Sequence, residues 1–357
     1  MIPIIRNWID RYFHNEEAVL LLVLLILFFL LIWTMGSDLG PIFTAVIIAF
    51  LMQGVVQWLK KRGMGHLMAV VTAFLFLISS TVAILLFLIP VIWRQMERLF
   101  SELPAMLTQG HELLLLLPEK YPVFVNEAQI ERLIEHLSNE LAAMGQAIFS
   151  LSVANLPLLF IVLLYFILVP LLVFFFLKDG SYMLRWVGSL LPKERPVMNK
   201  IWGEMNLQIA NYVRGKVIEL LIVAVVSCIA FMILDLRYAL LLGLAVGLSV
   251  VIPYIGAVVV TFPILLIGYF QWGFGYDLIV LTIVYLTIQA LDGNVLVPLL
   301  FSEAVKLHPV AIILAVLFFG GLWGFWGVFF AIPLATVIHV LLTVWPRSDV
   351  VDETATP

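Results

Sequence analysis

The sequence predicts an all-α polytopic membrane protein, and its composition and the lengths of its apolar runs indicate this class. Of its 357 residues, 64% are hydrophobic and only 12% are charged, and the mean hydropathy is +1.14. Soluble domains are about half apolar and about a quarter charged. A water-soluble core cannot bury so much apolar surface, so lipid must be the solvent for much of the chain.

About eight hydrophobic segments are long enough to cross or enter a bilayer, whose hydrocarbon core takes about 20 apolar residues. They lie roughly at 18–35, 41–59, 67–93, 154–177, 217–234, 239–270, 277–291 and 310–344. No small-residue cleavage site follows the first, which predicts a retained helix rather than a signal peptide. The single cysteine, Cys228, excludes an intramolecular disulfide and any cysteine-built metal site, and we predict no cofactor.

The distribution of basic residues predicts that both termini lie in the cytoplasm, because cytoplasmic flanks of membrane helices carry the excess of lysine and arginine. The loop after the second segment holds Lys60, Lys61 and Arg62 without an acid. Residues 94–150 instead carry four bases and eight acids. We therefore expect 94–150 to face the extracytoplasmic side. Within it, 129–148 has apolar residues at three- and four-residue spacing, which predicts an amphipathic helix.

Segment 239–270 is too long for one straight crossing and is interrupted by Pro253, Tyr254 and Gly256. Proline removes a backbone donor and clashes with the preceding turn, and glycine adds conformational freedom. At about 1.5 Å per residue, the helix before the break falls short of the membrane core. These features predict a helical hairpin that enters and leaves the membrane on one side.

Segment 310–344 is interrupted in the same way by four glycines within eight residues. Gly320 and Gly324 also have the spacing that lets two membrane helices approach closely, so helix packing is an alternative interpretation. Four glycines exceed what one contact face needs. We therefore favour a second hairpin, with its tip at Gly320, Gly321 and Gly324.

One single segment precedes each hairpin, namely 217–234 before the first and 277–291 before the second. The second half of the chain is therefore expected to form, in part, an inverted repeat of the kind that many secondary transporters use. Broken helices expose unpaired peptide groups, which membranes tolerate only beside protein or a hydrated cavity. The two hairpin tips thus predict a binding site for a small polar solute or an ion.

Polar residues are concentrated between Gln289 and Pro309, after the seventh segment. Asp292 and Asn294 flank Gly293 there, and an acid at the membrane edge indicates a functional site. The alternative is a turn in which both side chains cap backbone groups. Glu303 and Lys306 can pair on one helix face or line the pathway. The full set of candidate pathway residues is Pro253, Tyr254, Gly256, Gln289, Asp292, Asn294, Glu303, Gly320, Gly321 and Gly324.

Lys216 and Glu219 lie three residues apart at the start of the fifth segment. We interpret them as an ion pair whose long side chains extend toward the membrane surface.

The predicted segments divide the chain into five regions. Residues 1–93 form N-terminal scaffold helices, and 94–150 form an extracytoplasmic amphipathic insert. Residues 151–216 comprise a membrane helix and a cytoplasmic amphipathic segment. Residues 217–345 form a transport-type core with both hairpins, and 346–357 form a cytoplasmic tail.

Five ordered blocks resemble the autoinducer-2 exporter family of permeases, in particular its PerM-type bacterial branch, over nearly the whole chain. They are LLVFFFLKDG, QIANYVRGKVIE, SVVIPYIGAVVV, QALDGNVLVPLLFSEAVKLHP and GGLWGFWGVFFAIPLA. The resemblance implies a multi-pass protein of the bacterial inner membrane. Members of the family resemble elevator-type carriers and form homopentamers. The best-known branch exports autoinducer 2, and another exchanges sodium or lithium for protons.

We therefore expect outward movement of a small polar solute, similar to autoinducer 2, by an elevator-type or alternating-access mechanism. A sodium (lithium)/proton antiporter is the main alternative, with Asp292 and Glu303 carrying the coupling. A channel-like pore and a non-transporting scaffold that binds envelope proteins through 94–150 are further alternatives. No phosphate-binding loop and no nucleophile–base pattern occurs, so neither ATP-driven transport nor an enzyme is predicted. The basic residues lie at membrane flanks, where orientation explains them, so no nucleic-acid partner is expected.

Overall fold

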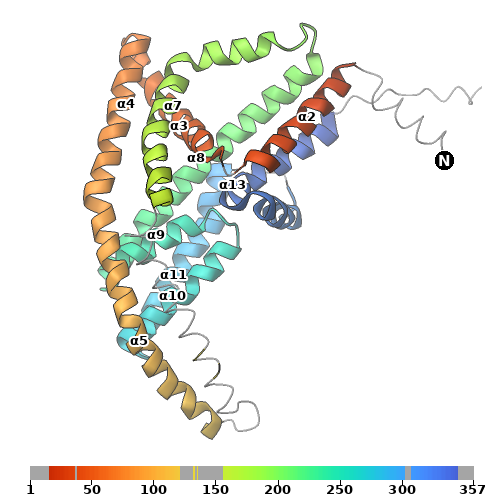
Figure 1. The fold of residues 1–357 in the computed structure, drawn as a ribbon. Coiled ribbons are helices and arrows are strands. Elements are labelled where there is room, and N and C mark those ends of the chain that lie inside the picture. Colours follow the sequence, from red (N-terminus) through yellow and green to blue (C-terminus); the bar gives the residue numbers. More distant parts are fainter. Residues whose placement is uncertain are drawn as a thin grey trace, which may run out of the picture.

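The computed structural model describes residues 16–36, 38–120, 132, 135, 156–301 and 307–344, and no strand occurs in these ranges. Their helices are α2 (Glu16–Met35), α3 (Gly40–Lys61), α4 (His66–Ala83), η1 (Ile84–Leu88), α5 (Ile89–Lys120), α7 (Leu156–Ser189), α8 (Pro196–Ile233), α9 (Ala239–Ser249), α10 (Ile255–Trp272), α11 (Tyr276–Leu291), η2 (Asp292–Leu296), α12 (Val297–Phe301) and α13 (Pro309–Val344) (Figure 1). In the described part of the chain, seven helical stretches are long and apolar enough to cross a membrane. The predicted all-α polytopic class is confirmed.

The third segment is longer than predicted. It was expected to end at residue 93, but α4 continues through the π-helical turn η1 into α5, and the three form one long rod at the edge of the molecule (Figure 1). The first part of α5 remains helical because Leu99, Leu103 and Met106 form an apolar stripe that packs against the start of α9. Of the predicted amphipathic helix over 129–148, only residues 132 and 135 are described, and both are helical.

The fifth segment also begins earlier than predicted. It was expected to begin at residue 217, after a separate cytoplasmic amphipathic segment within 151–216, but α8 runs without interruption from Pro196 to Ile233. Lys216 and Glu219 lie in its middle and pair with each other, which removes the need for a break. Their side chains are only 6% and 2% exposed, so the predicted extension toward the membrane surface is wrong.

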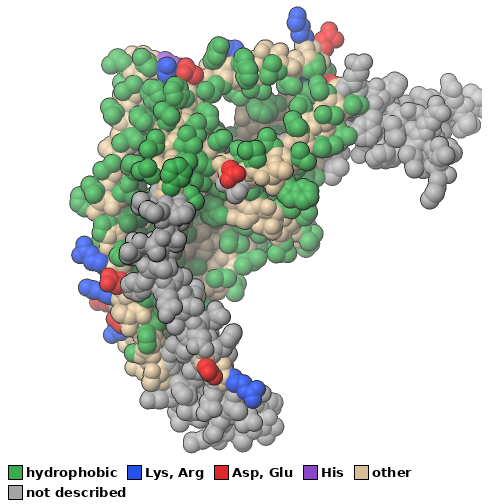
Figure 2. Space-filling model, in the orientation of Figure 1, with side chains coloured by type: hydrophobic (Ala, Val, Ile, Leu, Met, Phe, Trp, Pro, Cys, Tyr) green, Lys and Arg blue, Asp and Glu red, His purple; other side chains and the backbone are tan. Residues whose placement is uncertain are grey.

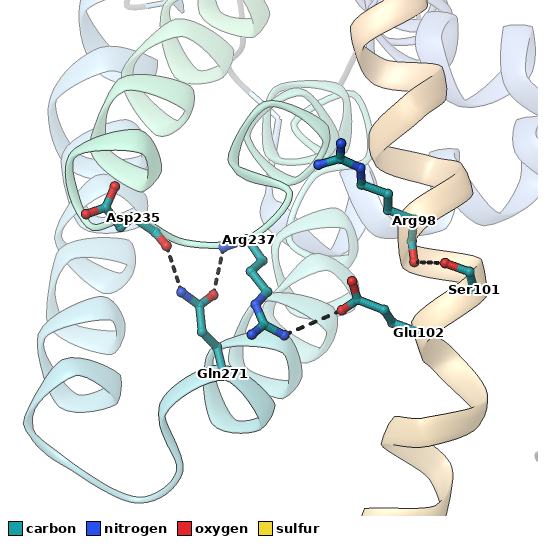
Figure 3. A network of polar contacts seen from close by, with 6 residues as sticks. All are labelled: Arg98, Ser101, Glu102, Asp235, Arg237 and Gln271. Carbon is teal, nitrogen blue, oxygen red and sulfur yellow. Dashed lines mark hydrogen bonds and ion pairs between the residues drawn. The ribbon is translucent and has the colours of Figure 1, made fainter.

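The first long run does form a hairpin, built from α9 and α10. The two ends of this hairpin meet at Gln271, near the end of α10. The Gln271 side chain bonds to two backbone groups of the loop before α9 (Figure 3). Gln271 Nε2 donates to the carbonyl oxygen of Asp235 at 2.7 Å, and the N–H of Arg237 donates to Gln271 Oε1 at 2.7 Å. The start of α9 and the end of α10 therefore lie side by side.

The structure predicts that Gln271→Leu loosens this hairpin, because it leaves two backbone groups without their partners. We expect a loss of about 1–3 kcal/mol in the free energy of unfolding. Glu102→Gln is the matched control. It removes the neighbouring contact between Glu102 and Arg237, which spans 3.5 Å with both side chains about half exposed, and exposed pairs contribute about 0–1 kcal/mol. Equal losses in denaturant unfolding of the two purified variants would contradict this assignment.

The tip of the first hairpin lies at Pro253 and Tyr254, as predicted. Tyr254 has φ +63°, a backbone conformation that costs energy for a residue other than glycine. Two residues later, Gly256 lies so close to the carbonyl of Ser249 that a Cβ atom would overlap with the carbonyl oxygen. The turn is therefore tight, and a glycine is required at position 256.

The second long run also reverses, at Gly324, where φ is +58° and ψ is −135°. On the two sides of this residue the arms are in contact, since a Cβ on Gly327 would overlap with the Phe319 carbonyl. Ala315, Val316 and Phe319 from the first arm share a core with Ala331 and Leu334 from the second. The predicted hairpin is present, but its break is at Gly324 alone, because Gly320 and Gly321 remain helical.

The seventh segment does not end in a turn at Asp292. The helix continues from α11 through the π-helical turn η2 into α12, so Asp292, Gly293 and Asn294 are helical. Asn294 Nδ2 donates to the carbonyl of Ala290 four residues earlier, at 2.8 Å. The interpretation of these residues as turn-forming caps is therefore wrong. Single π-helical turns widen a helix and are frequent at functional sites.

Five hydrophobic cores hold the described helices together, and two of them are the largest. One joins α3, α4 and α7 and includes Ala45, Ala69 and Val173. The other joins α8, α9, α10 and α11 with part of α5, and includes Phe231 and Tyr285. Outside these cores, apolar side chains cover most of the face in Figure 2, and its charged side chains lie mainly near the upper edge and along α5. Such an apolar exterior fits a protein surrounded by lipid.

Candidate functional site

A cavity of about 300 Å³ lies at the tip of the first hairpin, enclosed by α8, the turn between α9 and α10, the α11–η2–α12 rod and α13. This volume is at the small end of the range for small-molecule sites. Its lining consists of Tyr212, Lys216, Glu219, Ser249, Val250, Ile252, Pro253, Tyr254, Ala257, Gln289, Asp292, Gly293, Val297, Phe301, Ile312 and Ile332. The lining thus holds two acids and one base within mostly apolar walls.

The charged centre of the cavity is the pair formed by Lys216 and Glu219. Lys216 Nζ lies 2.8 Å from Glu219 Oε2, and both side chains are almost completely buried. Lys216 Nζ also lies 5.6 Å from the centre of the Phe301 ring, where a cation is attracted by the aromatic face. Because the two charges neutralise each other, the pair can remain ionised in an apolar environment.

Asp292 and Gln289 supply polar groups that no other described residue satisfies. Asp292 Oδ1 and Gln289 Nε2 are both buried and have no hydrogen-bond partner there. They are three residues apart, so they project from one side of the helical rod. A buried donor or acceptor without a partner costs about 1–3 kcal/mol, which a bound molecule can recover. Asp292 Oδ1 needs a hydrogen-bond donor, and Gln289 Nε2 needs a hydrogen-bond acceptor.

Aromatic side chains hold the wall beside the charged pair. Tyr212 is 3% exposed and donates through its hydroxyl to the carbonyl of Phe329, 3.3 Å away. Its ring lies 5.7 Å from that of Phe301. Gly215 permits this packing, since a Cβ there would come within 2.8 Å of Phe301. The contact between Tyr212 and Phe329 connects α8 to the second hairpin.

The structure brings only some of the predicted site residues together. Pro253, Tyr254, Gln289 and Asp292 line the cavity, and Gly256 supports the turn behind it. Asn294, Gly320, Gly321 and Gly324 are not part of the lining, so the second hairpin contributes the middle of its arms rather than its tip. Glu303 lies outside the described residues. The expectation of two facing tips is therefore wrong.

Three lining residues were missed as site residues because they were assigned to a membrane flank. Tyr212, Lys216 and Glu219 are spaced four and three residues apart, which places them on one face of α8. This spacing, together with an ion pair followed by a long apolar run, was the available signal. The charged residue at position 216 instead favoured a helix end there, so the shared face of the three residues was not recognised.

Comparison with known proteins now defines the family. The model of the AI-2E family transporters matches residues 21–347. The chain belongs to the AI-2E transporter family. It is 40% identical over 353 residues to the protein named "Putative permease PerM" of Escherichia coli K12, covering 99% of this chain and all of the relative.

More distant AI-2E relatives are also named as transport proteins. "Putative transport protein YrrI" of Bacillus subtilis is 28% identical over 309 residues, covering 85% of each chain. "Putative transport protein YueF" of the same organism is 27% identical over 303 residues, covering 84% of this chain and 81% of the relative. The chain is therefore a membrane protein of a transporter family.

Proposed function

We propose that this protein is an inner-membrane carrier that exports a small polar, hydroxylated solute similar to autoinducer 2. The carrying observation is the pair of buried polar atoms without partners, Asp292 Oδ1 and Gln289 Nε2, in a cavity at a broken helix. A hydroxyl group is both a donor and an acceptor, so a solute with neighbouring hydroxyls satisfies both atoms. An apolar molecule would leave both unsatisfied.

The charged pair and the hairpin give this site a means of accepting and releasing a solute. The solute would lie between the first hairpin tip, at Pro253 and Tyr254, and the rod that carries Asp292. Tyr254 is 59% exposed, which suits a residue at the mouth of the cavity. Movement of the first hairpin relative to α8 would open the site to the opposite side of the membrane, as alternating access requires.

The bundle of α3, α4 and α7 has a hydrophobic core of its own, which supports an elevator-type or alternating-access arrangement. It meets the helices around the cavity in another core, where Ile47 and Phe50 of α3 pack with Tyr212 and Phe329. In this proposal the bundle of α3, α4 and α7 is the scaffold, and the helices around the cavity form the moving unit. The excess of bases at 60–62 supports cytoplasmic termini. Association into a homo-oligomer, by family resemblance a pentamer, would hold the scaffolds together within the bilayer.

A second candidate is exchange of sodium or lithium for protons. The observation that favours it is the excess of acid in the cavity, since Lys216 neutralises Glu219 and leaves Asp292 as a further carboxylate. A cation could bind Asp292, but it would leave the Gln289 amide donor without an acceptor. This is why we place the hydroxylated solute first.

Reconstitution into proteoliposomes separates the two candidates. Vesicles are loaded either with autoinducer 2 or with a pH-sensitive dye. Protein-dependent release of autoinducer 2, without a dye response to a sodium or lithium pulse, supports the export proposal. A dye response without solute release supports the antiporter. Unitary currents in a planar bilayer would contradict both candidates, because they indicate a pore.

Asp292→Asn should reduce solute release at least tenfold while the protein still folds. The substitution keeps the shape of the side chain but removes the charged acceptor, and hydrogen bonds to charged groups contribute about 1.5–3 kcal/mol. Gln289→Leu should have a similar effect. Asn294→Ala is the matched control, because Asn294 is exposed, lies outside the lining and bonds only to its own helix among the described contacts. We expect it to stay within twofold of the wild-type rate, and a tenfold loss in this variant would contradict the assignment.

A further inference from the structure

A second cavity, of about 350 Å³, lies at the beginning of α8 and shares no lining residue with the proposed transport site. It is enclosed by α2, the end of α7, the beginning of α8 and the end of α13. Leucine, valine, isoleucine and methionine side chains form most of its walls, including Leu21, Leu25 and Leu184. These helices are apolar on their outer faces, so the cavity is surrounded by the lipid bilayer rather than by water.

The chemistry of the cavity is not purely apolar, because Arg195 is part of its lining. Arg195 Nη1 donates to the carbonyl of Gly188 at 2.6 Å, which fixes the guanidinium at this position. No described carboxylate lies within ion-pair distance of it. Four of the five guanidinium N–H donors are thus not used by this contact, and no residue that the structure describes serves as counter-ion to the positive charge.

Neighbouring charges reinforce the positive character of this end. Between residues 184 and 205 there are four bases, Arg185, Lys193, Arg195 and Lys200, against the acids Glu194 and Glu204. Glu17 also reaches this end, but its Oε1 accepts the N–H of Met198 at 2.7 Å and the residue does not line the cavity.

Trp202, which lines the same cavity, is 59% exposed. Tryptophan concentrates where the hydrocarbon core meets the headgroups, so it indicates the depth of the cavity in the membrane. An apolar slot at this depth, with an arginine on its wall that forms no ion pair with a described residue, has the form of a phospholipid site. The acyl chain would contact the leucines, and the phosphate would contact Arg195.

We propose that this cavity binds one anionic phospholipid, with an acyl chain between α2 and α8 and its phosphate on Arg195. The lipid would join α2 to the α7–α8 connection. It would therefore stabilise the folded protein in membranes that contain anionic lipids. The proposal does not depend on the cargo of the transport site, since the two cavities share no lining residue.

Native mass spectrometry of the full-length protein in detergent tests the proposal, with dioleoyl phosphatidylglycerol compared with dioleoyl phosphatidylcholine. The wild type should retain one phosphatidylglycerol per chain, with an affinity at least fivefold higher than for phosphatidylcholine. Arg195→Gln should reduce this preference about fivefold, the effect of about one basic residue near a lipid headgroup. Lys200→Gln and Arg185→Gln remove the same charge outside the lining, so they should preserve the preference.

Further variants keep the test decisive if loss of the contact with Gly188 prevents folding of Arg195→Gln. Arg195→Lys keeps the charge and should keep most of the preference. Val187→Trp fills the slot from a half-exposed position and should remove the tightly bound lipid, because Val187 is 50% exposed and lines the cavity. Equal retention of both lipids by the wild type, or unchanged retention in Val187→Trp, would overturn the proposal. So would displacement by millimolar glycerol phosphate, since this would show a site for the phosphate alone.

Discussion

Lys216→Met is expected to lower the free energy of unfolding by about 3–5 kcal/mol and to abolish transport. The ammonium group of Lys216 lies 2.8 Å from Glu219, whose side chain is 2% exposed. Methionine has similar length but no charge, so the substitution leaves an unpaired carboxylate in an apolar environment. Denaturant unfolding in detergent gives the stability, and solute release from proteoliposomes gives the activity.

A double variant separates the structural and functional roles of this pair. Lys216→Met with Glu219→Met removes both charges, and replacing a buried ion pair by apolar residues is often neutral for stability. We expect the double variant to fold nearly as well as the wild type but to remain inactive. Wild-type transport in the double variant would show that the pair is purely structural.

The control for this experiment is the exposed pair of Lys178 and Asp179. These side chains lie 3.6 Å apart and are 41% and 39% exposed. Solvent screens such a pair, so Lys178→Met should change stability by less than about 1 kcal/mol and leave transport unchanged. A comparable loss at both positions would mean that removal of positive charge, rather than burial of the pair, determines the effect.

The second large effect is expected at the hairpin glycines. Gly256→Ala and Gly327→Ala should each destabilise the protein by about 3 kcal/mol and reduce transport strongly. In both cases the new methyl group would overlap with a backbone carbonyl of the opposite arm, from Ser249 and Phe319 respectively. Backbone atoms cannot rotate away as a flexible side chain can, and overpacking of this kind costs about 1–3 kcal/mol or more.

Gly321→Ala is the matched substitution for these two. A Cβ at Gly321 would meet no atom within 4 Å, and its φ is negative. Because alanine also favours helix, this variant should be as stable as the wild type or slightly more stable. Thermal unfolding and the release assay on all three variants provide the comparison. A stable, active Gly256→Ala protein would mean that the first turn is looser than described.

The membrane class and the positions of the apolar segments were readable from composition and length. So were both hairpins, since Pro253 and Gly324 interrupt runs that are too long for one crossing. These features depend on local chemistry, namely the missing donor of proline and the backbone freedom of glycine. No tertiary contact was needed to predict them.

Several helix boundaries were not readable, because they depend on contacts between distant parts of the chain. Polarity suggested a stop at residue 216, yet burial of Lys216 against Glu219 lets α8 continue. Asp, Gly and Asn at 292–294 are typical turn formers, but they form a π-helical turn within the continuous helix from α11 to α12. In both places a local preference yielded to tertiary packing.

By itself, the sequence determined the fold class and the two broken helices, and it made Asp292 a candidate site residue because acids are rare in so apolar a chain. Only the tertiary structure decided which polar groups meet. It placed Lys216, Glu219 and Tyr212 opposite Asp292 and Gln289, and it excluded the second hairpin tip from the cavity. The physical reason is that periodicity specifies which side of one helix a residue occupies, whereas the packing of several helices specifies which sides enclose a common space.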